Sequence, residues 1–280
     1  MNDVAAGMAP RSAAYRVFVA VKYLTYVLLS FNVYLFLEEE LVSAAHSGLA
    51  NLDPAAIVQL FSATLDTAAW VLLLLLFELE TAVIPDTRLV GSTKLAIHGV
   101  RLVCGAAIVS AFVGYVGEWE VFLAATSLPA PACDLVAQGW SVLEDFDAFT
   151  PLTAENCAQY GRDTLQVTAL HQVLASPLAF ASAHDLALID VINAGAWIVV
   201  VIALEIEVRM QLRGGVPSKA QWLMNACKLL LYLILTAAAV YWGLEGEFLD
   251  FWDAALWLFA FFFIELNVFE WTKELDNQSE

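Results

Sequence analysis

Six apolar stretches of about twenty residues each divide this chain of 280 residues. A helix of about 20 apolar residues is needed to cross the roughly 30 Å of hydrocarbon in a bilayer. Apolar residues make up 61% of the chain and charged residues 15%, which is unlike the composition of soluble globular proteins. We therefore expect an all-α integral membrane protein with six transmembrane helices. The predicted spans are about 15–37, 67–85, 96–117, 191–209, 221–243 and 254–272.

The distribution of basic residues predicts the orientation of these spans. Of the twelve Lys and Arg residues, all except Arg162 fall on one side of the predicted membrane or in the adjacent helix turns. By the positive-inside rule, both termini and the connections 86–95 and 210–220 are expected in the cytoplasm. We interpret the first span as a retained signal anchor, because it is longer and more polar at its end than a cleaved signal peptide. The expected location is a bacterial-type inner (plasma) membrane, crossed several times.

The opposite side of the predicted membrane is strongly acidic, and the net charge of the chain is −18. One interpretation is a translocated surface that is kept soluble by its charge. The other is a vestibule whose negative potential concentrates cations and repels anions. The same charge argues against binding to nucleic acid or to an anionic lipid surface.

A long extracytoplasmic insertion, residues 118–190, separates the third and fourth spans. We expect it to contain short amphipathic helices, because apolar residues recur at helical spacing within 153–175. Cys133 and Cys157 both lie in this insertion, where an oxidising compartment favours a disulfide between them. Cys104 and Cys227 lie within predicted spans and are expected to be packing residues.

A pattern of polar residues recurs three times within the apolar stretches. An acid or amide is followed four residues later by Trp, and that Trp is followed eight residues later by Glu. Another polar residue stands two positions beyond each Glu. The three copies are Asp66, Trp70, Glu78 and Glu80; Asn193, Trp197, Glu205 and Glu207; and Asp253, Trp257, Glu265 and Asn267.

Each copy is preceded by an apolar span that carries one base. These bases are Lys22, Arg101 and Lys228, and an acid returns at a similar distance after each of them. The pattern predicts three helical hairpins of one design, each a basic helix running outward and an acidic helix returning. Because all three share one topology, a parallel repeat about an axis normal to the membrane is expected.

The predicted bases and acids lie at similar depth, so ion pairs within or between hairpins are expected to offset the cost of removing charge from water. Such pairs could simply hold the helices together. The bases are outnumbered, however, since Lys22, Arg101 and Lys228 face five carboxylates. We therefore predict that the acids line a cation pathway. These acids are Glu78, Glu80, Glu205, Glu207 and Glu265.

The tryptophan of each copy is predicted near the outer end of its span. This is the usual place for residues of an aromatic belt at the membrane surface. The alternative is that Trp70, Trp197 and Trp257 surround an outer mouth, with Asp66 and Asp253 beside them.

No sequence motif for catalysis, phosphate binding or metal binding is present, so we expect neither an enzyme nor a cofactor or metal. The predicted function is a cation channel or transporter, with the proton as one candidate cation. The alternative is a non-transporting integral subunit that scaffolds or binds partners in a larger membrane complex. The bilayer is the expected environment, and assembly as a homo-oligomer stays open.

Overall fold

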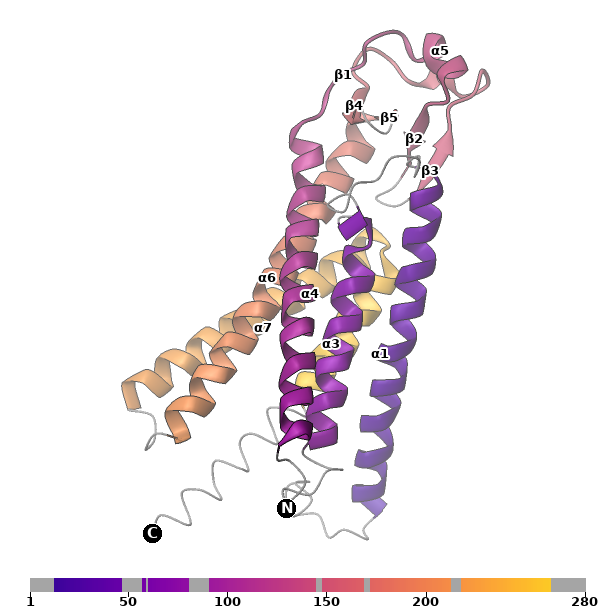
Figure 1. The fold of residues 1–280 in the computed structure, drawn as a ribbon. Coiled ribbons are helices and arrows are strands. Elements are labelled where there is room, and N and C mark those ends of the chain that lie inside the picture. Colours follow the sequence, from indigo (N-terminus) through magenta and orange to yellow (C-terminus); the bar gives the residue numbers. More distant parts are fainter. Residues whose placement is uncertain are drawn as a thin grey trace, which may run out of the picture. The chain divides into compact units, whose positions relative to one another are not determined.

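The computed structural model describes residues 13–46, 57–58, 60–80, 91–144, 148–168, 172–212 and 218–262. Most of these residues are helical, and Figure 1 shows the long helices. The labelled long helices are α1 (Ala13–His46), α3 (Ser62–Glu78), α4 (Ser92–Leu123), α6 (Pro177–Leu212) and α7 (Ser218–Glu245). Residues 248–262 form a further helix after α7.

Four of these helices are long and apolar enough to cross a membrane. They provide the spans Arg16–Val42, Ser92–Leu123, Pro177–Met210 and Ser218–Glu245. The two other predicted spans, 67–85 and 254–272, run into residues 81–90 and 263–280, which lie outside the described residues. A multi-pass helical membrane protein is thus supported, while the count of six spans stays a prediction.

α4 and α6 extend well beyond the spans predicted from hydropathy, and they take up both ends of the predicted insertion. α6 begins at Pro177, whose missing N–H is not needed at the first helical position. Ser176 Oγ accepts a hydrogen bond from Ala179 N at 3.2 Å and so caps the same end of the helix. The segment between the two helices is therefore shorter than predicted, from Ala124 to Ser176.

The chain divides into two compact units, Met1–Asn32 with Asn193–Glu280, and Val33–Ile192. In the second unit, α3 and α4 lie side by side (Figure 1). Glu40 of α1 caps the start of α3, where its carboxylate accepts hydrogen bonds from Ala63 N at 2.8 Å and Thr64 N at 3.2 Å. Because Phe61, the residue before α3, provides no side-chain cap, Glu40 satisfies these N–H groups from another helix.

The segment between α4 and α6 folds around a five-stranded sheet. The strand order is β1-β4-β5-β2-β3, with β2 parallel to β5 and the other neighbours antiparallel. Short helices accompany the sheet: α5 (Ala132–Leu135) and the 3₁₀ turns Val136–Gln138 and Cys157–Gln159. The strands are β1 (Thr126–Ser127), β2 (Ser141–Leu143), β3 (Phe149–Pro151), β4 (Leu165–Thr168) and β5 (Val173–Ala175).

The amphipathic helix predicted within 153–175 is therefore wrong, because β4 and β5 occupy its second half. β5 is buried on both faces: Leu174 packs with Trp140, while Val173 and Ala175 pack with Phe122 at the end of α4. A short apolar run that is covered on both sides has no alternating pattern, so periodicity alone does not separate it from a helix.

The predicted disulfide between Cys133 and Cys157 is confirmed. It joins α5 to the 3₁₀ turn Cys157–Gln159 beside the buried side chains of Leu135 and Trp140. The two other cysteines differ from each other. Cys104 is buried, as predicted for a packing residue, whereas Cys227 is exposed on α7.

Candidate functional site

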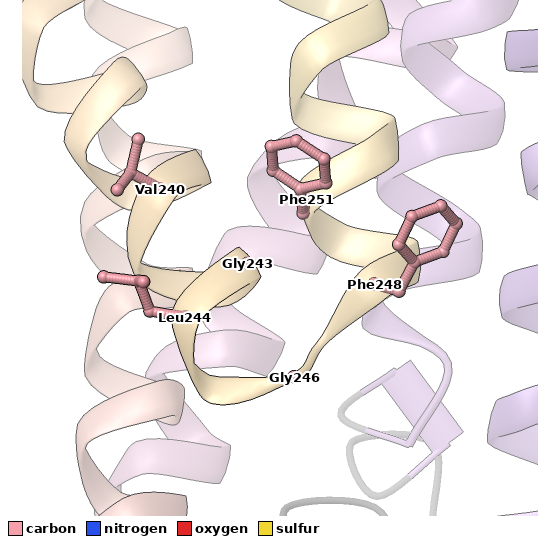
Figure 2. Close-up of a pocket in the computed structure, with 6 residues that line it drawn as sticks. All are labelled: Val240, Gly243, Leu244, Gly246, Phe248 and Phe251. Atoms are coloured by element: carbon pink, nitrogen blue, oxygen red, sulfur yellow. The ribbon is translucent and has the colours of Figure 1, made fainter.

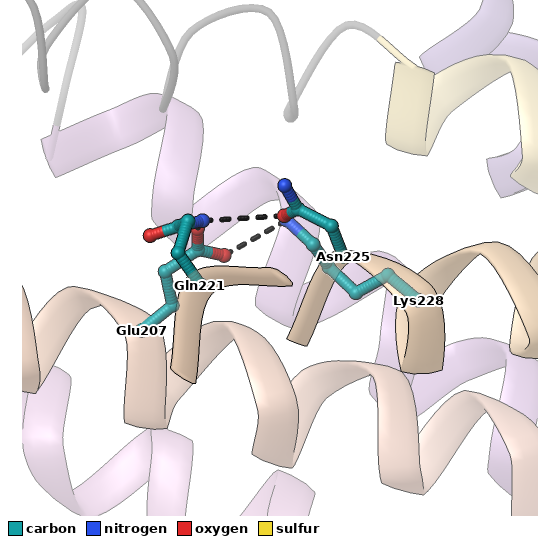
Figure 3. A network of polar contacts seen from close by, with 4 residues as sticks. All are labelled: Glu207, Gln221, Asn225 and Lys228. Carbon is teal, nitrogen blue, oxygen red and sulfur yellow. Dashed lines mark hydrogen bonds and ion pairs between the residues drawn. The ribbon is translucent and has the colours of Figure 1, made fainter. Parts of the chain in front are cut away.

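An ion pair joins the facing ends of α6 and α7. Lys228 Nζ lies 2.8 Å from Glu207 Oε2, and the two side chains are only 12% and 15% exposed. Gln221 Nε2 donates a hydrogen bond to the other Glu207 oxygen at 2.8 Å and contacts Asn225 Oδ1 at 3.2 Å. Figure 3 shows this network. Both oxygens of Glu207 are therefore satisfied by α7.

A second ion pair joins α3 to α4 in the same way. Arg101 on α4 contacts Glu80, which lies two residues beyond the end of α3. In both pairs the base comes 21 residues after the acid. The sequence separation between Glu80 and Glu207 equals that between Arg101 and Lys228. The two pairs therefore occupy equivalent positions of the sequence repeat. We call these two ion pairs the clips.

The acids that were predicted to act together have different partners in the structure. Glu80 and Glu207 form ion pairs with bases. Glu205 is exposed and pairs with Arg209, one helical turn later, at 2.6 Å. Glu78 is buried on α3, with 6% exposure. Glu265 lies outside the described residues.

The third base, Lys22, has a different setting. Its Nζ lies over the rings of Tyr23 and Tyr26, at 5.7 and 5.8 Å from the ring centres. In the sequence repeat, the polar group equivalent to Glu80 and Glu207 is Asn267, which lies outside the described residues. An ion pair between Lys22 and a carboxylate stays a prediction.

A polar contact of another kind joins α1 to the helix 248–262. Asn32 Nδ2 donates a hydrogen bond to Asp253 Oδ1 at 2.7 Å. The side chain of Trp257, one turn later, also hydrogen-bonds to Asp253. Asn32 is 1% exposed and Asp253 is half-buried. Among the described residues no Lys, Arg or His forms an ion pair with Asp253.

Two of the three repeated tryptophans are buried, and one of them, Trp257, lies beside this contact. Trp197 on α6 packs against Phe261, with ring centres 4.5 Å apart, and Trp257 lies 6.3 Å from the same ring. Because Trp197 and Trp257 are 7% and 6% exposed, they do not face the exterior as belt residues do. Trp70 and Asp66 are half-buried on α3.

Asn193 holds the position in α6 that Asp253 holds in its helix. Its side-chain oxygen is buried and has no hydrogen-bond partner within the described part of the chain. A buried polar atom of this kind is uncommon in folded proteins. Two copies of the repeat thus begin with a polar side chain that lies within the same unit. It is an amide at Asn193 and a carboxylate at Asp253.

Sequence reasoning missed Asn32, although it carries a detectable signal. It is an amide within the apolar run LLSFNVYLF of the first predicted span. Polar residues within such spans are costly and are usually functional. Bases and acids within apolar spans stand out by their charge, whereas a single amide does not. Because Asn32 was not recognised as a partner, Asp253 was assigned only to an outer mouth.

A pocket of about 360 Å³ lies at the turn between α7 and the helix 248–262 (Figure 2). Its lining offers no ionisable side chain, so it is unsuited to bind a cation. The lining residues are Val240, Gly243, Leu244, Gly246, Phe248 and Phe251.

The chain matches no protein-family model, no curated protein and no solved structure. Function is therefore inferred from the side-chain geometry described above. The contact of Asn32 with Asp253 is the strongest candidate, since it combines a carboxylate, a buried amide and the absence of a described cationic partner.

Proposed function

We propose that this protein conducts or transports a cation across a bacterial-type inner membrane and that Asp253 is the carboxylate that binds it. The observation that carries the proposal is the contact of Asp253 with Asn32 and Trp257, two uncharged donors, in a helix next to α1. The proposal includes six spans, cytoplasmic termini and an acidic outer side that gathers cations.

The physical reason lies in the cost of a carboxylate in an apolar setting. An ionised carboxylate that is removed from water costs several kcal/mol unless a base, a metal ion or a proton offsets its charge. Two hydrogen bonds offset part of this cost, but they leave the net charge in place. A carboxylate held in this way is suited to bind a cation and to release it.

The clips limit which other acids take part. Glu80 and Glu207 have fixed cationic partners, and we assign them a role in joining helices. Glu205 is exposed and bonded to Arg209, which also weakens its candidacy. Glu78 is buried, so it stays in the proposed pathway together with Glu265.

The test is cation flux in reconstituted liposomes under an imposed gradient, with and without a membrane voltage. Asp253→Asn is expected to reduce flux at least tenfold, because an amide of the same shape cannot carry charge. Asn is the natural residue at the equivalent position 193, so this variant is expected to fold. Asp185→Asn, which changes an exposed acid of α6, is the matched control and should change flux far less than Asp253→Asn does.

The clips also favour a second candidate, a non-transporting integral subunit of a larger membrane complex. Two equivalent ion pairs between consecutive helices suit a rigid scaffold as well as a transporter. Wild-type liposomes that pass no cation under any gradient would replace the transport proposal with this one.

A further inference from the structure

We infer that the cation bound by Asp253 is a proton. We also infer that the side-chain amide of Asn32 rotates when the proton binds, so that its acceptor Oδ1 replaces its donor Nδ2 opposite Asp253. The inference rests on the proposed function and narrows it to one cation. Its basis is the chemistry of the two groups that meet the carboxylate.

Both neighbours present N–H groups to Asp253. Asn32 does so through Nδ2 at 2.7 Å, and the indole of Trp257 has a donor and no acceptor. A metal cation requires several oxygen ligands around it. Donor hydrogens aimed at the carboxylate occupy two of its roughly four lone pairs and repel such an ion. The described surroundings of Asp253 therefore suit a metal ion poorly.

A proton has none of these requirements, since it needs one lone pair of one carboxylate oxygen. Once Asp253 Oδ1 is protonated, its O–H becomes a donor that faces Asn32. The amide of Asn32 carries an acceptor oxygen beside its donor nitrogen, and a half-turn about its terminal bond brings Oδ1 into place. Trp257 continues to donate to the carboxyl group throughout.

The step balances with one proton and no other reactant. An O–H bond forms on Asp253, the hydrogen bond from Asn32 Nδ2 to Asp253 Oδ1 breaks, and a hydrogen bond from Asp253 O–H to Asn32 Oδ1 forms. The net charge of the contact changes from −1 to zero. Since Asn32 is on α1 and Asp253 is on the helix 248–262, the exchange occurs where two helices meet.

The other polar groups around this contact do not replace the proton. On its own helix Asp253 follows Asp250, and Glu247 directly precedes that helix. Both are acids, and their charge would favour proton uptake further. On α1, the next charged group after Asn32 is the acidic run that begins at Glu38. On α6, Trp197 contacts Phe261 of the same helix, and the polar residue one turn before Trp197 is the uncharged Asn193.

The experiment is infrared difference spectroscopy of the full-length protein in liposomes between high and low pH, combined with flux of H⁺, Na⁺ and K⁺ in the same preparation. A band of a protonated carboxyl group is expected at low pH and should be lost in Asp253→Asn. A change in a side-chain amide band is expected to accompany it and should be lost in Asn32→Leu. That variant keeps the carboxyl group without its acceptor, so the carboxyl band should move to higher frequency, which also covers the case that Asp253→Asn folds poorly.

The outcomes separate this inference from the proposed function. Proton flux that depends on Asp253, with the matching carboxyl band, supports both. Na⁺ or K⁺ flux that depends on Asp253 without proton flux overturns the inference and leaves cation transport standing. A titrating Asp253 band without flux of any cation supports proton binding and overturns transport. A spectrum with no carboxyl band that depends on Asp253 overturns the inference, whatever the flux.

Discussion

Lys228 Nζ lies 2.8 Å from Glu207 Oε2, and little of either side chain is exposed. The contact ties the end of one long helix to the start of the next, and Arg101 repeats it with Glu80. A buried ion pair contributes little net stability when it is intact, but loss of one partner leaves an uncompensated charge. The clips are therefore best tested by removing one charge and then both.

Replacing Lys228 by Met should destabilise the protein by about 3 kcal/mol, the usual cost of an unpaired buried charge. The double variant Lys228→Met with Glu207→Leu should recover most of this loss. Arg209→Met is the control, because its exposed pair with Glu205 should contribute less than about 1 kcal/mol. Thermal unfolding in detergent measures all three, and equal losses for Lys228→Met and Arg209→Met would contradict the buried clip.

Replacing Asn193 by Leu should raise the thermal stability. Its side-chain oxygen is buried without a described partner, and such an atom costs about 1–3 kcal/mol. Asn32→Leu is the comparison and should lower stability, because it removes the hydrogen bond to Asp253. A loss of stability in Asn193→Leu as large as that in Asn32→Leu would indicate a partner for Asn193 outside the described residues.

Changing Cys133 and Cys157 to Ser should loosen the sheet segment without unfolding the long helices. The disulfide closes a loop of 24 residues, for which a stabilisation of roughly 3 kcal/mol is typical. Hydrogen exchange should become faster in β2 and β5 and stay unchanged in the centre of α7. Uniformly faster exchange throughout the chain would show that the segment and the helices unfold together.

Tyr160 should titrate at higher pH than an ordinary tyrosine. Burial raises the pKa of its hydroxyl, and the charge of Glu144 and the hydrogen bond to it raise the pKa further. The neutral phenol is thus favoured in the folded state, so its contribution to stability is present below the ordinary pKa and is lost as the pH rises through the raised one. Ultraviolet absorbance of tyrosinate in wild type and Tyr160→Phe measures this, and Glu144→Gln should lower the midpoint.

Hydropathy was sufficient to predict the long helices, because about twenty apolar residues in a row have few alternatives to a membrane-spanning helix. The recurrence of bases and acids correctly indicated ion pairs at Arg101 and Lys228. It did not indicate which acid each base would pair with. Positions two residues apart lie on different faces of a helix, and the packing of the next helix decides which of them meets the base. The bases pair with Glu80 and Glu207, while Glu205 pairs with Arg209.

The strands and the contact with Asp253 were harder to predict for other reasons. β5 is covered from both sides by residues distant in sequence, so its apolar run had no readable period. Asn32 and Asp253 are 221 residues apart, and the local sequence around either residue does not predict the other as its partner. Pairing across such a distance follows from tertiary packing alone.

The separation of Asn32 and Asp253 also sets an order of assembly during synthesis. At roughly 5–20 residues per second, Asp253 is made about 10–40 seconds after Asn32. Through that interval the nascent α1 has to hold an amide without its final partner, while the clip between Glu80 and Arg101 can already close. The contact between Glu80 and Arg101 can thus form early in synthesis, whereas the contact between Asn32 and Asp253 forms late.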